Sequence, residues 1–203
     1  MKKITFFSAF VLIFLSSYLS AQKQVFTYQF DKPQLKASSD GYTDITYKNC
    51  INMGKEGTPL LPQFSANLLL PPGTEISSVK VTGVEYYTEE NGIAIRPASR
   101  QFPISVGAPK GYRAVPDQKI YSSDAAYPSE ETSAIYTGFL SGHAMGSFHI
   151  CPVVYFPSLL KAKFIKSITI EVSEKTTEQA TRALDMLRSN KSVNDRIISI
   201  AQH

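Results

Sequence analysis

Short alternating runs of apolar and polar residues, separated by glycine and proline, are the feature that most constrains this fold. In residues 57–83, every second position of the first run is apolar and faces one side of a strand: Phe64, Ala66, Leu68 and Leu70. Pro71, Pro72 and Gly73 end that run, and a second alternating run follows at 79–83. A strand, a turn and another strand in this order are typical of an antiparallel sheet.

Similar runs recur along the rest of the chain, and the polar segment 35–41 is read as the turn between the first two. Strands are expected at 25–30, 42–47, 49–53, 93–96, 134–140, 145–150 and 164–172. A single helix is expected at 178–189, and the sequence IISI at 197–200 is read as a last short strand. We therefore expect an all-β fold, an antiparallel β-sandwich of jelly-roll-like type with one C-terminal helix.

The first 21 residues have the pattern of a signal peptide. Lys2 and Lys3 precede the apolar run 6–15, and small residues lead to Ala21 as the expected cleavage position. The run is shorter than the roughly 20 residues that a membrane-spanning helix needs. The expected organisation is thus a signal peptide at 1–21, a β-sandwich domain at 22–175, and a C-terminal helix and tail at 176–203. The protein is expected to be exported, to the periplasm or to the cell surface and beyond, with no membrane span after cleavage.

Charge gives little reason to expect a nucleic-acid partner. The formal net charge is +4 over the whole chain, and the two lysines of the signal account for half of it. The remaining lysines and arginines are scattered rather than gathered in a basic run. No nucleic-acid partner is expected.

The segment 97–133 differs from the rest of the chain because it is rich in residues that interrupt strands and helices. Its prolines are Pro97, Pro103, Pro109, Pro116 and Pro128. A loop of this length in a compact domain is uncommon and is more often functional than idle. We expect the functional surface here.

Motifs for catalysis or cofactor binding are absent from the sequence: it has no Walker loop, dinucleotide-binding glycine pattern, zincin motif, serine elbow or CxxC pair. His143, His149 and Cys151 lie close in sequence, but they lack the fourth ligand of a structural zinc site and the opposed geometry of a Cys–His nucleophile pair. No cofactor, metal site or catalytic residue is predicted, and the chain is not expected to be an enzyme.

Two cysteines occur, Cys50 and Cys151. Export would permit a disulfide between them, and closing a loop of about 100 residues would stabilise the fold by roughly 4–5 kcal/mol in the chain-entropy model. Two separate buried thiols are the alternative, because free cysteine packs as a small apolar residue.

Five segments in order resemble the N-terminal propeptide of the gingipain family of secreted, caspase-like cysteine proteases. They are GTPLLP, LLLPPGTEISSVKV, RPASRQFP, YSSDAAYP and GSFHICPVVYFP. The residues that carry the resemblance are Gly57, Pro59, Leu61 and Pro62; Leu68, Leu70, Pro71, Gly73 and Thr74; Pro97 and Pro103; Tyr127 and Pro128; and Pro152, Val153, Tyr155 and Pro157. The resemblance covers roughly 25–174.

This resemblance implies an all-β sandwich that assists the folding of a cysteine protease and keeps it latent by lying across the active site. It also implies that a basic side chain enters a specificity pocket that prefers Arg or Lys. The candidates here are Lys110, Arg113 and Lys119, and the alternative for each is a solvated loop charge. The expected partner is a cysteine protease catalytic domain, acting in trans or separately encoded, since the positions of the family's His–Cys dyad are absent from this sequence.

Other functions are compatible with the same fold, because a β-sandwich can carry many functions. A secreted module that binds a glycan or a surface protein is the main rival, although the chain has no tryptophan for an aromatic platform. A truncated remnant of a protease precursor, or a fragment that assembles with a separate catalytic chain, is the third interpretation.

Overall fold

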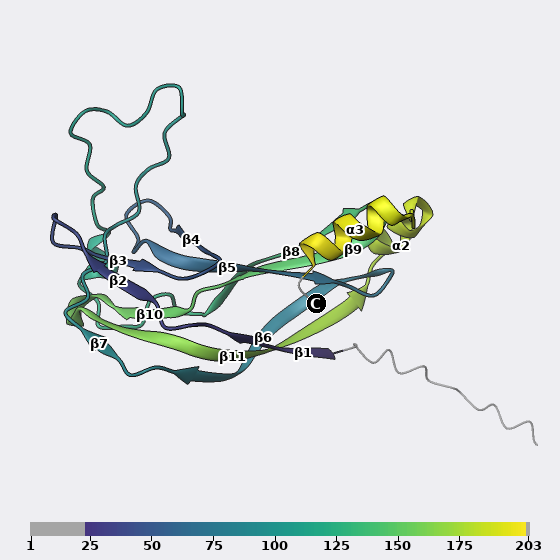
Figure 1. The fold of residues 1–203 in the computed structure, drawn as a ribbon, viewed down its shortest axis with the longest axis horizontal. Coiled ribbons are helices and arrows are strands. Elements are labelled where there is room, and N and C mark those ends of the chain that lie inside the picture. Colours follow the sequence, from purple (N-terminus) through teal and green to yellow (C-terminus); the bar gives the residue numbers. More distant parts are fainter. Residues whose placement is uncertain (1–22, 202–203) are drawn as a thin grey trace, which may run out of the picture.

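Two antiparallel sheets lie face to face in a computed structural model of the chain, which describes residues 23–201 (Figure 1). The expected signal peptide lies outside the described residues. The first sheet contains β1 (Lys23–Gln29), β6 (Thr74–Tyr86), β7 (Glu90–Asn91), β10 (Val153–Phe156) and β11 (Lys161–Thr176). The second runs in the order β4 (Cys50–Met53), β5 (Leu61–Leu69), β9 (His143–Ile150), β8 (Thr132–Leu140). The expected all-β antiparallel sandwich is confirmed.

The long strand β11 is the spine of the first sheet. Its residues 167–173 pair with both β1 and β6, and Lys161 and Ala162 pair with both β7 and β10. The predicted alternation holds, with Phe164, Ile168 and Ile170 fully buried. Ile165 is also buried, because the pairing with β6 shifts register between Ile165 and Ser167.

Aromatic rings join the two sheets. The ring of Tyr28 on β1 lies 5.6 Å from that of Phe64 on β5, and 6.3 Å from that of Phe148 on β9. Phe30 meets Phe64 edge to face, with centroids 5.7 Å apart. The inward faces of both sheets therefore form one continuous core.

Three expectations about strands are wrong, and the third, the strand at 197–200, lies in a helix described below. Segment 93–96 is not a strand, although single backbone hydrogen bonds tie it to three neighbours: Ile93 N–H to Leu160 O, Thr43 N–H to Ala94 O, and Leu60 N–H to Arg96 O. The polar segment 35–41 contributes to a strand, since β2 (Gln34–Ala37) pairs with β3 (Thr43–Thr46) in a separate hairpin. All four β2 residues are exposed, so they carry no burial pattern that would mark a strand.

The C-terminal helix is shorter than expected and is followed by a second one. Helix α2 (Glu178–Ala183) begins at the N-cap Thr177 and passes into the 3₁₀ turn η2 (Leu184–Met186). Helix α3 (Lys191–Ile200) then covers the expected strand at 197–200. Asn190 starts this helix, because its side-chain oxygen accepts a hydrogen bond from Val193 N–H at 3.0 Å.

The segment 97–133 is mostly irregular, as expected. Within it, α1 (Gln118–Tyr121) is a single turn of helix, and the 3₁₀ turn η1 (Pro157–Leu159) packs nearby. The part before α1 rises away from the sandwich as a long excursion of the chain (Figure 1).

Candidate functional site

A loop that projects from the body is the most distinctive surface of the molecule. We call residues 99–116 the projecting loop; the chain leaves the sandwich at Ala98 and returns at Asp117 (Figure 1). Most of its residues are exposed, and Ile104 is fully so, at 102% of its reference area. Two valines, Val106 and Val115, are 78% and 75% exposed. The loop therefore presents apolar side chains to solvent.

Gly57 holds both arms of the loop at its foot. Its N–H donates to Ala98 O at 3.0 Å, and its carbonyl accepts a hydrogen bond from Asp117 N–H at 2.9 Å. Gly57 has φ +81°, and a Cβ there would lie 3.0 Å from Val115 O. A residue of the stretch that identifies the fold thus fixes the point from which the loop departs.

Arg96 lies just before the outgoing arm and connects it to another part of the chain. Its guanidinium donates to Asp40 at 3.1 Å and, through two nitrogens, to Asp44 at 3.0 and 3.2 Å. It also donates to Ser38 and lies over the ring of Tyr42. These partners belong to the turn and the second strand of the β2–β3 hairpin, so this hairpin, whose strand β2 was not expected from the sequence, supports the loop.

The two arms of the loop are also held to each other. The rings of Phe102 and Tyr112 meet edge to face with centroids 4.9 Å apart. The Tyr112 hydroxyl oxygen accepts a hydrogen bond from Arg100 N–H at 3.2 Å, and the Arg100 guanidinium lies over the Phe102 ring. Beyond its foot, the loop is therefore held together by contacts among its own residues.

The three predicted basic residues fall in two places. Lys110 and Arg113 lie close to each other in sequence within the projecting loop, and both are exposed. Lys119 lies at the foot in α1, where its backbone N–H donates to the capping Asp117 side chain at 2.9 Å. None of the three side chains forms an ion pair or hydrogen bond with another described residue.

A groove of about 930 Å³ opens at the foot of the loop. Its lining includes Lys55, Arg100 and His149, together with apolar surface from Met53 and Ile120. It adjoins β4, an edge strand of the second sheet. The groove brings cationic and apolar groups together but contains no carboxylate that would make an acid–base pair.

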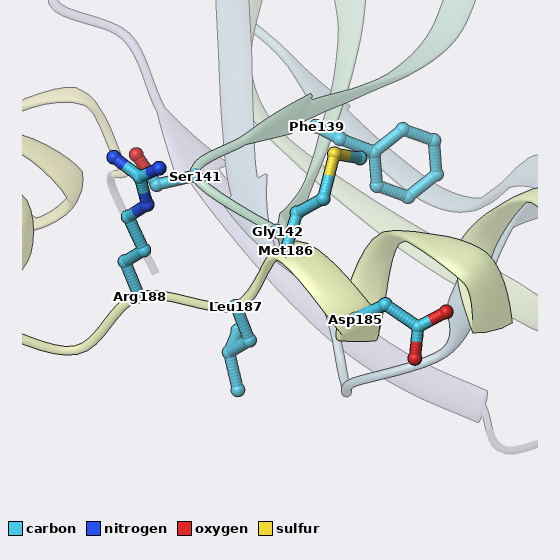
Figure 2. A pocket seen from close by; sticks show the side chains of 7 residues that line it. All are labelled: Phe139, Ser141, Gly142, Asp185, Met186, Leu187 and Arg188. Atoms are coloured by element: carbon cyan, nitrogen blue, oxygen red, sulfur yellow. The ribbon is translucent and has the colours of Figure 1, made fainter.

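A second hollow of about 490 Å³ lies between the β8–β9 turn and the end of η2. Figure 2 shows Met186 against the ring of Phe139 and Arg188 beside Ser141, while Asp185 and Leu187 point away. A Cβ on Gly142 would lie 2.5 Å from Leu187 Cα, so backbone packs on backbone here. This hollow is a packing junction without a set of catalytic groups.

The residues considered for metal binding or nucleophilic chemistry are not assembled into a site. His143 donates from Nε2 to Arg188 O at 3.0 Å, whereas His149 lines the groove at the other end of β9. Among residues 23–201, no three histidine, cysteine or carboxylate side chains gather as metal ligands would. No helix in this part of the chain is long and apolar enough to cross a membrane.

Both cysteines are free thiols in the structure. Cys151 is buried and donates from Sγ to Val153 O at 3.2 Å, and burial raises the pKa of its thiol to about 12. Burial also raises the pKa of Cys50 to about 11. Neither thiol has the depressed pKa of a nucleophile. The proximity of Cys50 also raises the pKa of the Cys151 thiol, after burial, and the bridge between the two stays a prediction.

Comparison with known proteins connects this arrangement to one family. The model of the C25 propeptide family, Propeptide_C25, matches residues 15–196. No curated protein matches the chain.

Two solved structures share the fold. A chain in the complex of Porphyromonas gingivalis RgpB pro- and mature domains is 21% identical, covering 90% of this chain and 94% of that one, with a TM-score of 0.69. A structure on the zymogenic latency of gingipain K from Porphyromonas gingivalis gives 18% identity, 76% and 88% coverage, and a TM-score of 0.63. At these identities the likeness establishes the fold.

Proposed function

We propose that this chain, which belongs to the C25 propeptide family, binds the catalytic domain of a cysteine endopeptidase and keeps it latent or assists its folding. The membership confirms the resemblance carried by the five sequence segments. The family consists of non-catalytic propeptide domains, and we propose that this chain likewise has no enzymatic activity of its own. The two related structures concern a complex of pro- and mature domains and zymogenic latency, which supports this assignment.

The observation that carries the proposal is a loop anchored at its foot, with exposed cations that have no partner in the described chain. A cation without an intramolecular partner is free to pair with a carboxylate on another protein. Lys110 and Arg113 lie in this loop and are exposed, so we assign them the role of reaching an acidic specificity pocket. Lys119, in α1 at the foot, is the weaker candidate.

Export is part of the same proposal. The basic start and apolar run of residues 1–21 support cleavage after Ala21, which would place the domain where a secreted protease matures. N-terminal sequencing of the protein recovered outside the cytoplasm is expected to begin at Gln22. A protein that starts at Met1, or that stays in the cytoplasm, would contradict this part.

The central experiment uses the mature domain (22–203) as bait on the exported fraction of the organism that produces it. A matched bait carries K110A, R113A and K119A together. Eluates are assayed with peptide substrates that end in Arg or Lys, with and without a thiol-alkylating reagent. The wild-type domain is expected to retain a cysteine endopeptidase and to inhibit it in proportion to added protein, whereas the triple variant inhibits at least tenfold more weakly.

Two results would overturn the proposal in different ways. Recovery of no cysteine endopeptidase with the wild-type bait would remove the assigned partner. Equal inhibition by the wild-type domain and the triple variant would leave the partner but remove the role of the three basic side chains. Substitution of these residues, which are exposed and unpaired, is expected to leave the melting temperature unchanged, so loss of folding does not explain a loss of inhibition.

A further inference from the structure

We propose that Ile104 and Val106, on the outgoing arm of the projecting loop, form a second and apolar contact with the same endopeptidase. This inference rests on the proposed function and adds an interaction that the basic residues do not supply. The partner surface is thus inferred to carry an apolar depression beside an acidic pocket.

The exposure of these two side chains is the first argument. Single exposed apolar residues are normal on a protein surface. Ile104 and Val106, however, lie two positions apart in a loop that projects from the body, at 102% and 78% exposure. Burial of one such side chain contributes about 1.5–3 kcal/mol. The free domain lacks this stabilisation because both side chains are exposed.

The packing of the aromatic residues within the loop also supports the proposal. Phe102 and Tyr112 pack against each other within the loop, and Arg100 contacts both of them. The aromatic rings of the loop therefore pack on each other, whereas the side chains of Ile104 and Val106 stay exposed to solvent. Because these contacts order the loop before binding, less conformational entropy is lost when a partner covers it.

Charge is the third argument. The sequence from Arg96 to Pro116 contains no acidic residue, while Arg100, Lys110 and Arg113 are cationic. An apolar loop with only positive charge fits an acidic partner surface with an apolar depression. An anionic membrane would also attract such a loop, but membrane interfaces favour aromatic side chains at the point of insertion. Here the loop's aromatic rings pack on each other, which favours a protein.

The test compares three variants of the mature domain against the endopeptidase recovered with the wild-type bait. They are I104S/V106S, K110A/R113A, and the control I198S on α3, a helix that lies apart from the projecting loop (Figure 1); Ile198 is 73% exposed. Association and dissociation rates are measured at low and high salt, and melting temperatures are measured for all.

I104S/V106S is expected to dissociate at least tenfold faster than the wild type at both salt concentrations, because apolar contacts are insensitive to screening. K110A/R113A is expected to associate more slowly and to lose salt dependence. I198S is expected to match the wild type. Because Ile104 and Val106 are exposed, I104S/V106S is expected to keep the wild-type melting temperature.

Each other outcome overturns the inference in a recognisable way. If the wild type inhibits the endopeptidase and I104S/V106S binds within threefold of it, the apolar contact is absent and the proposed function stands. If the wild type recovers no endopeptidase, both fail together. If the wild type binds phosphatidylglycerol-containing vesicles, I104S/V106S does not, and protease inhibition is unchanged, the two side chains serve a membrane instead.

Discussion

Gly57 shows how one residue can link the fold to the candidate site. Its two backbone hydrogen bonds hold Ala98 and Asp117, the two ends of the projecting loop. Because φ is +81° and a Cβ would lie 3.0 Å from the carbonyl oxygen of Val115, the position favours glycine. The same glycine also belongs to the segment that identifies the family.

Replacing Gly57 with alanine is expected to destabilise the domain by about 2–3 kcal/mol, since strain at positive φ adds to a close backbone contact. Gly41→Ala is the matched control, because Gly41 has φ +87° but no atom lies within 4 Å of the place that its Cβ would occupy. Denaturant unfolding of both variants measures the difference. Equal losses in the two variants would mean that the contact with Val115 O has no energetic role.

Glu174 is a second residue whose environment has a measurable consequence. It is 2% exposed on β11; Gln24 donates to its Oε1 at 2.8 Å, and Oε2 has no hydrogen-bond partner among the described residues. Burial raises the pKa of this carboxyl above its ordinary value. The folded state therefore favours the protonated form, and stability is lost as the pH rises through the raised pKa.

Glu174→Gln is accordingly expected to stabilise the domain at neutral pH by on the order of 1–2 kcal/mol. The advantage is expected to vanish at acid pH, below the ordinary glutamate pKa of 4.5, where Glu174 is protonated in both states. Glu171→Gln, on the same strand and paired with Lys23 at 3.0 Å, is the control and is expected to show no gain. Thermal melts from pH 4 to pH 8 would contradict the account if the gain were independent of pH.

The raised pKa values of the two cysteine thiols lead to a further prediction. Because burial raises both thiol pKa values, Cys50 and Cys151 are expected to resist alkylation at pH 8 in the folded protein and to react fully when it is unfolded. Mass spectrometry counts the modified thiols. Protein purified from the exported fraction provides a second answer: if it reacts in denaturant only after reduction, the predicted bridge exists there.

At the scale of elements, the projecting loop is an ordered segment although it contains no strand. Its foot is held by Gly57 and Arg96, and its arms by Phe102 and Tyr112. Order in such a segment comes from a few specific contacts, so single substitutions can remove it.

Tyr112→Ala is expected to speed tryptic cleavage after Lys110 and Arg113 several-fold, because loss of the ring contact lets the arms separate. Tyr112→Phe removes only the hydroxyl that accepts from Arg100 N–H and is expected to have a small effect. Tyr136→Ala, at an exposed tyrosine on β8, is the control. Cleavage rates that do not differ among the three variants would show that the aromatic pair does not order the loop.

At the scale of the whole molecule, the sandwich is a rigid support for that loop. The rings on β1 meet those on β5 and β9, so both sheets share one core. The strand β5 shows the consequence most directly, because Leu68 is 1% exposed and its neighbour Leu69 is 42% exposed.

Leu68→Ala is expected to cost about 2–5 kcal/mol of unfolding free energy, since it leaves a cavity between the sheets. Leu69→Ala makes the same chemical change on the outer face and is expected to cost under about 1 kcal/mol. Denaturant unfolding of the pair tests the alternation directly. Similar losses would mean that the two faces of β5 are not distinguished by burial.

The sequence alone was sufficient for the strands that face the core and for the family. Alternation at Phe64, Ala66, Leu68 and Leu70 predicts an apolar strand face because successive side chains of a strand point to opposite sides. The sequence also led us to the three basic candidates, which lie in the Pro-rich segment 97–133. The strand β2 has no such signal because all four of its residues are exposed. Asn190 directly follows the expected helix 178–189, although its side chain starts the next helix.

The tertiary structure decided how the projecting loop, the candidate functional segment, is held and which side chains it exposes. Gly57 and Ala98, or Arg96 and Asp44, are far apart in sequence, and hydrogen bonds between such residues have no local pattern. The same holds for the exposure of Ile104 and Val106, which depends on where Phe102 and Tyr112 pack. Local periodicity determined the sandwich, whereas contacts between distant segments determined the shape of the loop that it carries.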